Sequence, residues 1–433
     1  MFKQLFQQYQ NNHRAKQVIS LLAVNVLVIP LSFVSNIFIT RFLGPIGFGD
    51  FKFLLYVINF SLVLFNFGFF QAGNRALVLN KDPEKGREYY GSMLVILAGL
   101  FLIIAISLFG YALVDNNINE KGLRTMLISI IPFSWIFLLV TYFEVLFQAD
   151  NRISLLAKSR LFPKIIFFIS ILILYLFYFN YVGNRLKIIW IILLGTYFIG
   201  FLSIIYKVNP SFKNVKTRIT EIWFFNKTYG FNVYFGALFN VGFSALSALL
   251  ISYFGINNSG VGFYSLALTI AEPLAFIPNV IATTHYKDFS TRTSIPKRLI
   301  LITIAVTFSA LALIWLLVGP FIKYFYGPEF NSVISLTFIV SLGVILNGFA
   351  DFFNRFLGSH GQGKALRNSA IIVGCFIMVS NITLIPLLGE WGAAYTLVFS
   401  ALIYVLNMLW FYRRLVLKLA KKSDDQRISQ NNN

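Results

Sequence analysis

Two otherwise apolar stretches of the chain carry polar side chains at intervals of seven residues. The two stretches are offset by 213 residues, close to half of the 433-residue chain. The polar side chains are Lys52, Asn59 and Asn66 in the first stretch, and Ser265, Glu272 and Asn279 in the second. Because residues seven apart lie on one face of a helix, each stretch predicts a helix with one polar face. Because a polar stripe is costly in lipid, such a face should point to the protein interior or to a water-filled cavity.

Glu272 is the member of this set best suited to ion coupling. An ionisable side chain near the middle of a bilayer costs about 2.5–3.5 kcal/mol to insert, and Pro273 follows it and frees a backbone carbonyl. Protonation of Glu272 would admit an anionic solute, and its deprotonation would expel one. A structural carboxylate, paired with a cation or bonded to the freed carbonyl, is the alternative. The Asn and Ser side chains fit either a cavity wall or interhelical hydrogen bonds.

Cationic side chains at the ends of the apolar runs are candidates for binding an anion. Arg41 and Lys52 lie near predicted outer ends, and Arg75 lies near an inner end. Further candidates at inner ends are Arg152, Lys287 and Arg355. The inner cations fit anchors at the cytoplasmic surface equally well. Two more carboxylates, Glu144 and Asp351, lie near inner ends and fit either helix-end contacts or a gate.

The composition places this chemistry in a membrane. Apolar residues make up 58% of the chain and charged residues only 12%, with a net charge of +20. This composition excludes a soluble, disordered or nucleic-acid-binding protein. The excess of basic residues is expected to interact with the headgroups of membrane lipids. The single cysteine, Cys375, and three scattered histidines predict no disulfide, metal site or other cofactor. No catalytic triad or hydrolase-like carboxylate pair is visible, so we expect a protein that is not an enzyme.

Charge-free apolar runs predict twelve transmembrane helices. Eleven runs are visible, and a glycine-rich stretch at 255–262 divides the run 228–271 into two crossings. The predicted fold is all-α, with two six-helix lobes related by a parallel pseudo-two-fold repeat. The predicted parts are a lobe at 1–206 that begins with a surface helix, a basic linker at 207–227, a second lobe at 228–415 and a basic tail at 416–433.

The distribution of lysine and arginine predicts the orientation. With twelve crossings, 29 of the 36 basic residues fall on the side that holds both termini. Basic residues concentrate in cytoplasmic loops. Both termini are therefore predicted to be cytoplasmic.

Two motifs resemble a known family. Residues 39–51, ITRFLGPIGFGDF, are similar to the LGPxGFG(D/E)(F/Y) signature of Wzx-type polysaccharide flippases of the multidrug/oligosaccharidyl-lipid/polysaccharide (MOP) superfamily. Residues 147–152, FQADNR, are similar to a hairpin of the same proteins. The resemblance implies a MATE-like V-shaped bundle with a cationic cavity and a lipid-tail groove, and coupling to an ion gradient. Lipid II flippases carry arginines in the first helix, whereas residues 17–40 hold no cation.

The function that this resemblance implies is the flipping of undecaprenyl-diphosphate-linked oligosaccharides, such as O-antigen units, to the outer leaflet of a bacterial inner membrane. A polysaccharide polymerase and assembly proteins are the expected partners. A multidrug or small-molecule antiporter of the same superfamily remains an alternative, although the cations favour an anionic cargo. A membrane-embedded glycan-modifying enzyme is a second alternative, but the chain lacks the large outer loop or embedded His/Asp site of such enzymes.

Overall fold

The computed structural model describes residues 13–80, 82–179, 181, 183–238 and 243–431. Every regular element within these ranges is helical, and none of them is a strand. The prediction of an all-α fold is therefore confirmed. The predicted surface helix at the N-terminus falls largely on residues 1–12, outside the described residues.

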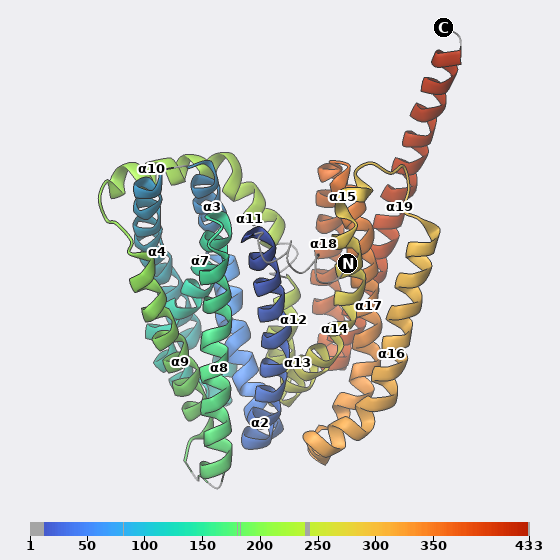
Figure 1. Cartoon of the computed structure of the whole chain (residues 1–433). Helices are drawn as coiled ribbons and strands as arrows, with labels where there is room; N and C mark the ends of the chain where they lie inside the picture. Colours follow the sequence, from blue (N-terminus) through green and yellow to red (C-terminus); the bar gives the residue numbers. More distant parts are fainter. Residues whose placement is uncertain (1–12, 81, 180, 182, 239–242, 432–433) are drawn as a thin grey trace, which may run out of the picture. The chain divides into compact units, whose positions relative to one another are not determined.

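Contacts divide the chain into two units, Met1–Leu238 and Phe239–Asn433 (Figure 1). The boundary therefore follows Leu238, whereas the sequence placed it before residue 228. The helices of unit 1 are α2 (His13–Leu64), α3 (Phe69–Leu79), α4 (Pro83–Val114), α5 (Asn116–Glu120), α6 (Arg124–Ile130), η1 (Ile131–Phe133), α7 (Trp135–Ala149), α8 (Ile153–Tyr178), α9 (Arg185–Val208), α10 (Val215–Phe225), η2 (Asn226–Gly230) and α11 (Phe231–Ala237). The helices of unit 2 are α12 (Phe243–Phe254), α13 (Ser259–Ala271), α14 (Pro273–Thr284), α15 (Tyr286–Phe289), α16 (Lys297–Phe325), η4 (Pro328–Phe330), α17 (Ser332–Ser359), α18 (Gly363–Leu388) and α19 (Glu390–Asn431).

Helix α2 is broken at Gly44, where φ is +70° and ψ is 179°. A side chain would be strained in this backbone conformation, and glycine tolerates it. Pro45 then begins the second half of α2, where the N–H group that proline lacks has no helical partner to lose. Figure 1 shows the two halves running in opposite directions, from dark to lighter blue. The LGPxGFG motif is therefore the turn between the first two predicted spans.

A second break separates α2 from α3. The Asn66 side chain accepts a hydrogen bond from the Gly68 N–H at 2.9 Å, and Gly68 has a φ of +83°. A Cβ atom on Gly68 would lie 2.4 Å from the carbonyl carbon of Gly230 in η2. The glycine therefore lets the start of α3 pack directly against the π-helical turn between α10 and α11.

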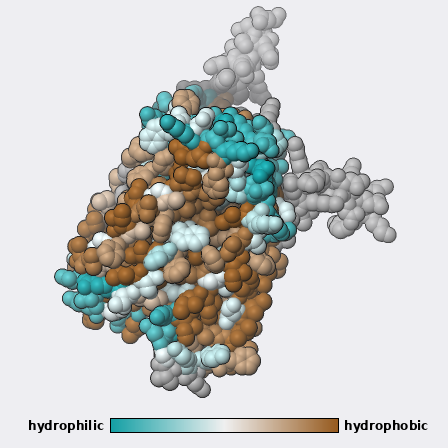
Figure 2. Space-filling view, turned by 90° about the vertical axis from the view of Figure 1, so that its left-hand side faces the viewer, coloured by the Kyte–Doolittle hydropathy of each residue, from teal (hydrophilic) through white to brown (hydrophobic). Residues whose placement is uncertain are grey.

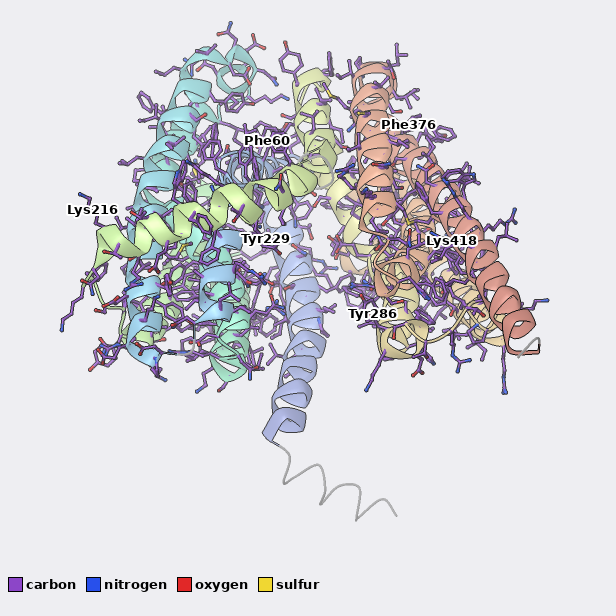
Figure 3. The ribbon with its side chains drawn as sticks, turned by 90° about the horizontal axis from the view of Figure 1, so that it is seen from above. Phe60, Lys216, Tyr229, Tyr286, Phe376 and Lys418 are labelled. Carbon is purple, nitrogen blue, oxygen red and sulfur yellow. The ribbon has the colours of Figure 1, made fainter. Side chains whose placement is uncertain are left out.

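The segment predicted as a basic linker contains α10, which packs on unit 1 against α3 and α4. The Arg218 guanidinium bonds Glu88 of α4 at 2.8 Å and Glu221 at 2.5 Å. The Tyr89 hydroxyl also donates to Glu221. Figure 3 shows α10 lying across the helices of unit 1, with Lys216 near one of its ends and Tyr229 beyond the other. The linker is therefore a docked helix, because its charges pair with residues about 130 positions earlier in the chain.

The ionisation of this cluster follows from its burial and its partners. Burial alone would raise the pKa of the Glu221 carboxyl, but hydrogen bonds from Tyr89 and Arg218 outweigh it and the net pKa is lowered. Burial opposes the charge of Arg218 as well, yet the carboxylates of Glu221 and Glu88 raise its pKa above the usual value. The cluster is thus stable as ionised groups near neutral pH.

Unit 2 is built around the parallel pair α17 and α19, which make the most extensive helix contact among the described residues. Helix α18 packs on α19, and α13 and α14 pack on α17. Helix α19 continues to Asn431, so the predicted tail is helical up to that residue. Glu272 lies at the junction of α13 and α14, where Pro273 begins the second helix.

Among the described residues, nine helices are long and apolar enough to cross a membrane, or ten if the bent pair Arg124–Phe133 and Trp135–Ala149 is one crossing. The number twelve is consistent with this if the two halves of α2 are separate crossings and α11 with α12 form another. Figure 2 shows hydrophobic residues over the middle of one face and hydrophilic residues toward its ends. The protein is therefore a multi-pass membrane protein.

Candidate functional site

Unit 1 encloses a polar cavity of about 320 Å³ between both halves of α2 and helices α7, α8 and α9. The polar side chains of its wall are Ser32, Ser35, Asn36, Lys52, Asn59, Thr141, Lys164 and Tyr197. Apolar residues complete the wall, among them Phe51 and Phe167. The hairpin at Gly44 is what brings Asn36 and Lys52 to the same cavity. A turn encoded by the LGPxGFG motif therefore builds this site.

The cavity wall is cationic. Lys52 and Lys164 are its charged residues, and no acidic side chain lines it. The Lys52 ammonium lies 5.2 Å from the centre of the Phe48 ring. Lys164 makes no ion pair with an acidic side chain in the described part of the chain. Because a partly desolvated cation is stabilised by a counter-charge, this wall suits a small anion of about two negative charges.

The predicted polar face of the second helix divides in the structure. Lys52 and Asn59 line the cavity, whereas Asn66 accepts the hydrogen bond from Gly68 that ends the helix. Its local capping role is one that seven-residue spacing does not predict. Of the three residues predicted to share one helix face in unit 1, only Lys52 and Asn59 line the same cavity.

Arg41 and Arg75 lie outside this cavity. The exposed Arg41 donates to the Tyr175 hydroxyl at 3.5 Å, near the turn of α2. The guanidinium of Arg75 lies 5.9 Å from the centre of the Tyr229 ring. A direct role of either residue in binding stays a prediction.

The corresponding residues of unit 2 have separate surroundings. Ser265 is buried in α13, and Glu272 is exposed at the helix junction. The Asn279 side chain accepts a hydrogen bond from Arg355 at 3.4 Å, so the structure brings one predicted cavity residue to one predicted cation. A single cavity shared with Lys52 and Asn59 would need both units, and it stays a prediction.

Two candidate groups at the inner ends have ion-pair partners. Arg152 pairs with Asp150, with its Nε atom 2.5 Å from the carboxylate. Glu144 pairs with Arg160 of α8. Both pairs lie within unit 1 and neutralise local charge. This favours the structural interpretation of Arg152 and Glu144 over a role in binding cargo.

Unit 2 has a polar cavity of its own, of about 260 Å³, between α17, α18 and α19. Asp351 accepts a hydrogen bond from the Tyr404 hydroxyl at 3.0 Å, and the Asn354 amide donates to the same hydroxyl at 2.7 Å. Asn347 and Ser400 also line this cavity. A carboxylate amid hydroxyl and amide oxygens can hold a proton or a small cation.

Several of these residues were missed from the sequence. Lys164 directly precedes the apolar run 165–184 and is one of the 29 basic residues that the sequence places on the cytoplasmic side. Helix α8 in fact begins at Ile153, so Lys164 lies about three turns inside it. Asn36 and Tyr197 carried no spacing signal. Asp351 precedes Arg355 by four residues, a spacing that predicts a contact within one helix and gives no sign of Tyr404 on α19.

A comparison with protein families decides the identity. The sequence profile of the family described as "polysaccharide biosynthesis protein" matches residues 15–286, which is more than half of the chain. The chain belongs to this family. No curated protein matches the sequence. The family match covers unit 1 from residue 15 onward, including the Lys52–Lys164 cavity, and reaches the start of α15 in unit 2.

Solved structures of two transporters share the fold. The lipid II flippase MurJ in an inward closed conformation is 13% identical, with a TM-score of 0.70 over 94% of this chain and 90% of that chain. An inward-facing MATE multidrug resistance transporter of the MOP superfamily is 14% identical, with a TM-score of 0.69 over 94% of this chain and 99% of that chain. At this identity the likeness shows the MOP-type fold and nothing finer.

Proposed function

We propose that this member of the polysaccharide biosynthesis family is a flippase for oligosaccharides linked to a polyprenyl diphosphate. It would move them from the cytoplasmic to the outer leaflet by alternating access between its two units. Family membership supports a role in polysaccharide assembly. The MOP-type fold, which MurJ shares, supports transport of a lipid-linked cargo.

The observation that carries this proposal is the cationic wall of the unit 1 cavity. Two lysines face the cavity and no carboxylate lines it. A diphosphate is the part of the cargo with matching charge, and a buried or half-buried anion needs such partners. A cationic drug would instead meet two like charges, so the cavity disfavours the multidrug alternative.

The cavity volume limits which part of the cargo enters. About 320 Å³ is near the lower end of the range for pockets that hold drug-sized molecules. The diphosphate fits this volume, and a sugar chain of several rings exceeds it. The sugars would therefore lie outside the cavity.

Coupling to an ion gradient would act through a carboxylate in unit 2. Glu272 is the candidate from the sequence, and it lies at a helix junction that Pro273 weakens. Asp351 is a second candidate because it lines a polar cavity with Tyr404 and Asn354. Protonation of the coupling carboxylate would remove a negative charge that repels the diphosphate. Substitution of each in turn distinguishes them.

The finer parts of the proposal concern location and partners. The distribution of basic residues supports a cytoplasmic location of both termini. The membrane would be a bacterial inner membrane, as the resemblance to Wzx-type flippases implies. A polymerase and assembly proteins that use the flipped product, such as those for O-antigen, would be its partners.

Reconstitution tests the proposal directly. Purified protein is placed in vesicles that contain a polyprenyl-diphosphate oligosaccharide in both leaflets, and an added glycosidase digests the accessible half. Flipping predicts that digestion continues beyond that half when the protein is present. The doubly substituted Lys52→Gln/Lys164→Gln protein should stop near one half, as protein-free vesicles do. Digestion that stops at one half with the unsubstituted protein, under every ion gradient applied, would reject the proposal.

A further inference from the structure

A second recess of unit 2 is an apolar groove of about 490 Å³ between α16, α17 and α19. Its wall consists of Ile300, Thr303, Ile304, Phe308, Ile345, Leu346, Phe349, Phe352, Phe353, Val405, Leu409, Tyr412 and Arg413. The groove arises because α19 packs along α17 extensively whereas α16 packs on α17 more sparsely. Most side chains of α16 are accordingly exposed. Figure 1 shows α16 in orange beside α17 and α19.

The wall of this groove suits hydrocarbon. Most of its residues are aliphatic or aromatic, and Phe308 and Phe349 stack across it with ring centres 6.4 Å apart. Its two hydroxyl groups already have partners. Thr303 donates to the Leu299 carbonyl at 2.8 Å, and Tyr412 accepts from the Ile295 N–H at 3.0 Å. Each hydroxyl is thus engaged with the backbone, and burial of an apolar chain is a favourable way to fill the groove.

One end of the groove is cationic. Arg413 forms that end, is exposed, and makes no ion pair with an acidic side chain of the described residues. The hydrogen bond from Ile295 to Tyr412 holds the start of α16 at the same end. Lys297 and Arg298 open that helix. An anionic group at this end would therefore meet several cations.

The groove and the polar cavity of unit 2 lie on different faces of the α17–α19 pair. Asn347, Asp351 and Tyr404 face the polar cavity, whereas Leu346, Phe349 and Val405 face the groove. Adjacent residues of each helix thus serve two chemically distinct sites. The helix pair separates an occupant of the groove from the polar cavity.

We propose that the groove binds one acyl chain of an anionic phospholipid, with the phosphate of its headgroup at Arg413. The charge at the mouth, the dry wall and the sparse packing of α16 together fit this occupant. The lipid would fill the space between α16 and the α17–α19 pair and so stabilise unit 2. A resident phospholipid is favoured over the polyprenyl cargo because the α17–α19 pair separates the groove from the polar cavity of unit 2. The inference is independent of whether the protein is a flippase.

Lipid binding to the purified full chain tests this inference. The protein is delipidated in detergent and titrated with phosphatidylglycerol or phosphatidylcholine, and native mass spectrometry and thermal unfolding are recorded. We expect phosphatidylglycerol to bind more tightly and to raise the unfolding temperature. Arg413→Gln should weaken its binding about tenfold, the size of one charge-assisted contact. Arg414→Gln is the matched control, because Arg414 lies 5.6 Å from the Trp410 ring and outside the groove wall.

A substitution within the groove tests the chain-binding part separately. Leu409→Trp would fill the groove and should abolish stabilisation by phosphatidylglycerol. If this variant does not fold, the comparison of Arg413→Gln with Arg414→Gln still decides the proposal. Equal affinity of these two variants for phosphatidylglycerol would overturn it, as would equal binding of the two phospholipids. Co-purification of a polyprenyl phosphate that phosphatidylglycerol does not displace would assign the groove to the cargo instead.

Discussion

Removal of the Lys164 charge should weaken binding of a diphosphate far more than removal of a neighbouring lysine. Lys164 lines the unit 1 cavity from α8. Lys158 lies on the same helix but is exposed and outside the cavity wall. Each lysine is changed to glutamine in turn. Both substitutions remove one positive charge from α8, so a difference between them reports whether the charge lies in the cavity wall.

The expected magnitude follows from the contact that is lost. A hydrogen bond to a charged group contributes about 1.5–3 kcal/mol, and each 1.4 kcal/mol corresponds to roughly tenfold in affinity. Lys164→Gln should therefore weaken binding of polyprenyl diphosphate by roughly 10- to 150-fold. Lys158→Gln should change it less than about threefold, since an exposed charge acts weakly through solvent. Lys164→Arg keeps the charge and should recover part of the loss.

The assay is direct binding of a labelled polyprenyl diphosphate to each purified variant, with thermal unfolding recorded to show that each variant is folded. Lys52→Gln should give a loss similar to that of Lys164→Gln. The double variant should lose less than the sum of the two single losses if both lysines contact one anion. Equal affinities of the Lys164→Gln and Lys158→Gln proteins would refute the assignment of the cavity to the diphosphate.

Three further predictions concern packing, pH and coupling. Gly68→Ala should reduce the yield of folded protein, because its Cβ atom would lie 2.4 Å from the backbone of Gly230 and the φ of +83° is strained for alanine. Gly99→Ala is the control and should fold normally, because no atom lies within 4 Å of its Cβ position. Folding lowers the pKa of Glu221. The stability that this carboxylate contributes is therefore present above its pKa in the unfolded chain, and it is lost as the pH falls through its lower pKa in the folded chain. Unfolding measured from neutral to acidic pH should show that a Glu221→Gln protein lacks this pH-dependent part of the stability. Glu272→Gln and Asp351→Asn each remove one candidate coupling carboxylate. The variant that removes the true coupling group should abolish gradient-driven flipping while diphosphate binding survives. Normal gradient-driven flipping by both variants would contradict coupling at either residue.

The helical architecture was predictable because a bilayer imposes it. An apolar run of sufficient length has no other way to satisfy its backbone in lipid, and the charge-free run at 89–114 indeed lies within α4. Hydropathy does not detect the part of a helix that lies in water. Helix α4 begins at Pro83, where the Asp82 side chain accepts from the Glu84 N–H at 2.9 Å.

The site was only partly predictable, because spacing reveals a helix face but not what opposes it. Lys52 and Asn59 were identified through their seven-residue period and share the cavity. Lys164 was missed because a charge ends an apolar run even when the helix continues past it. The docking of α10 depends on the pairing of Arg218 with Glu88, a long-range contact that a basic, linker-like composition conceals.

Leaflet-specific accumulation of lipid-linked glycan in cells with and without this gene tests the central claim most directly. The account predicts that loss of the gene traps polyprenyl-diphosphate oligosaccharide in the cytoplasmic leaflet. The unsubstituted gene should restore its outward transfer, and the Lys52→Gln/Lys164→Gln gene should not, at equal protein levels. Unchanged outer-leaflet glycan in cells that lack the gene, where no other flippase acts on the same glycan, would contradict the account.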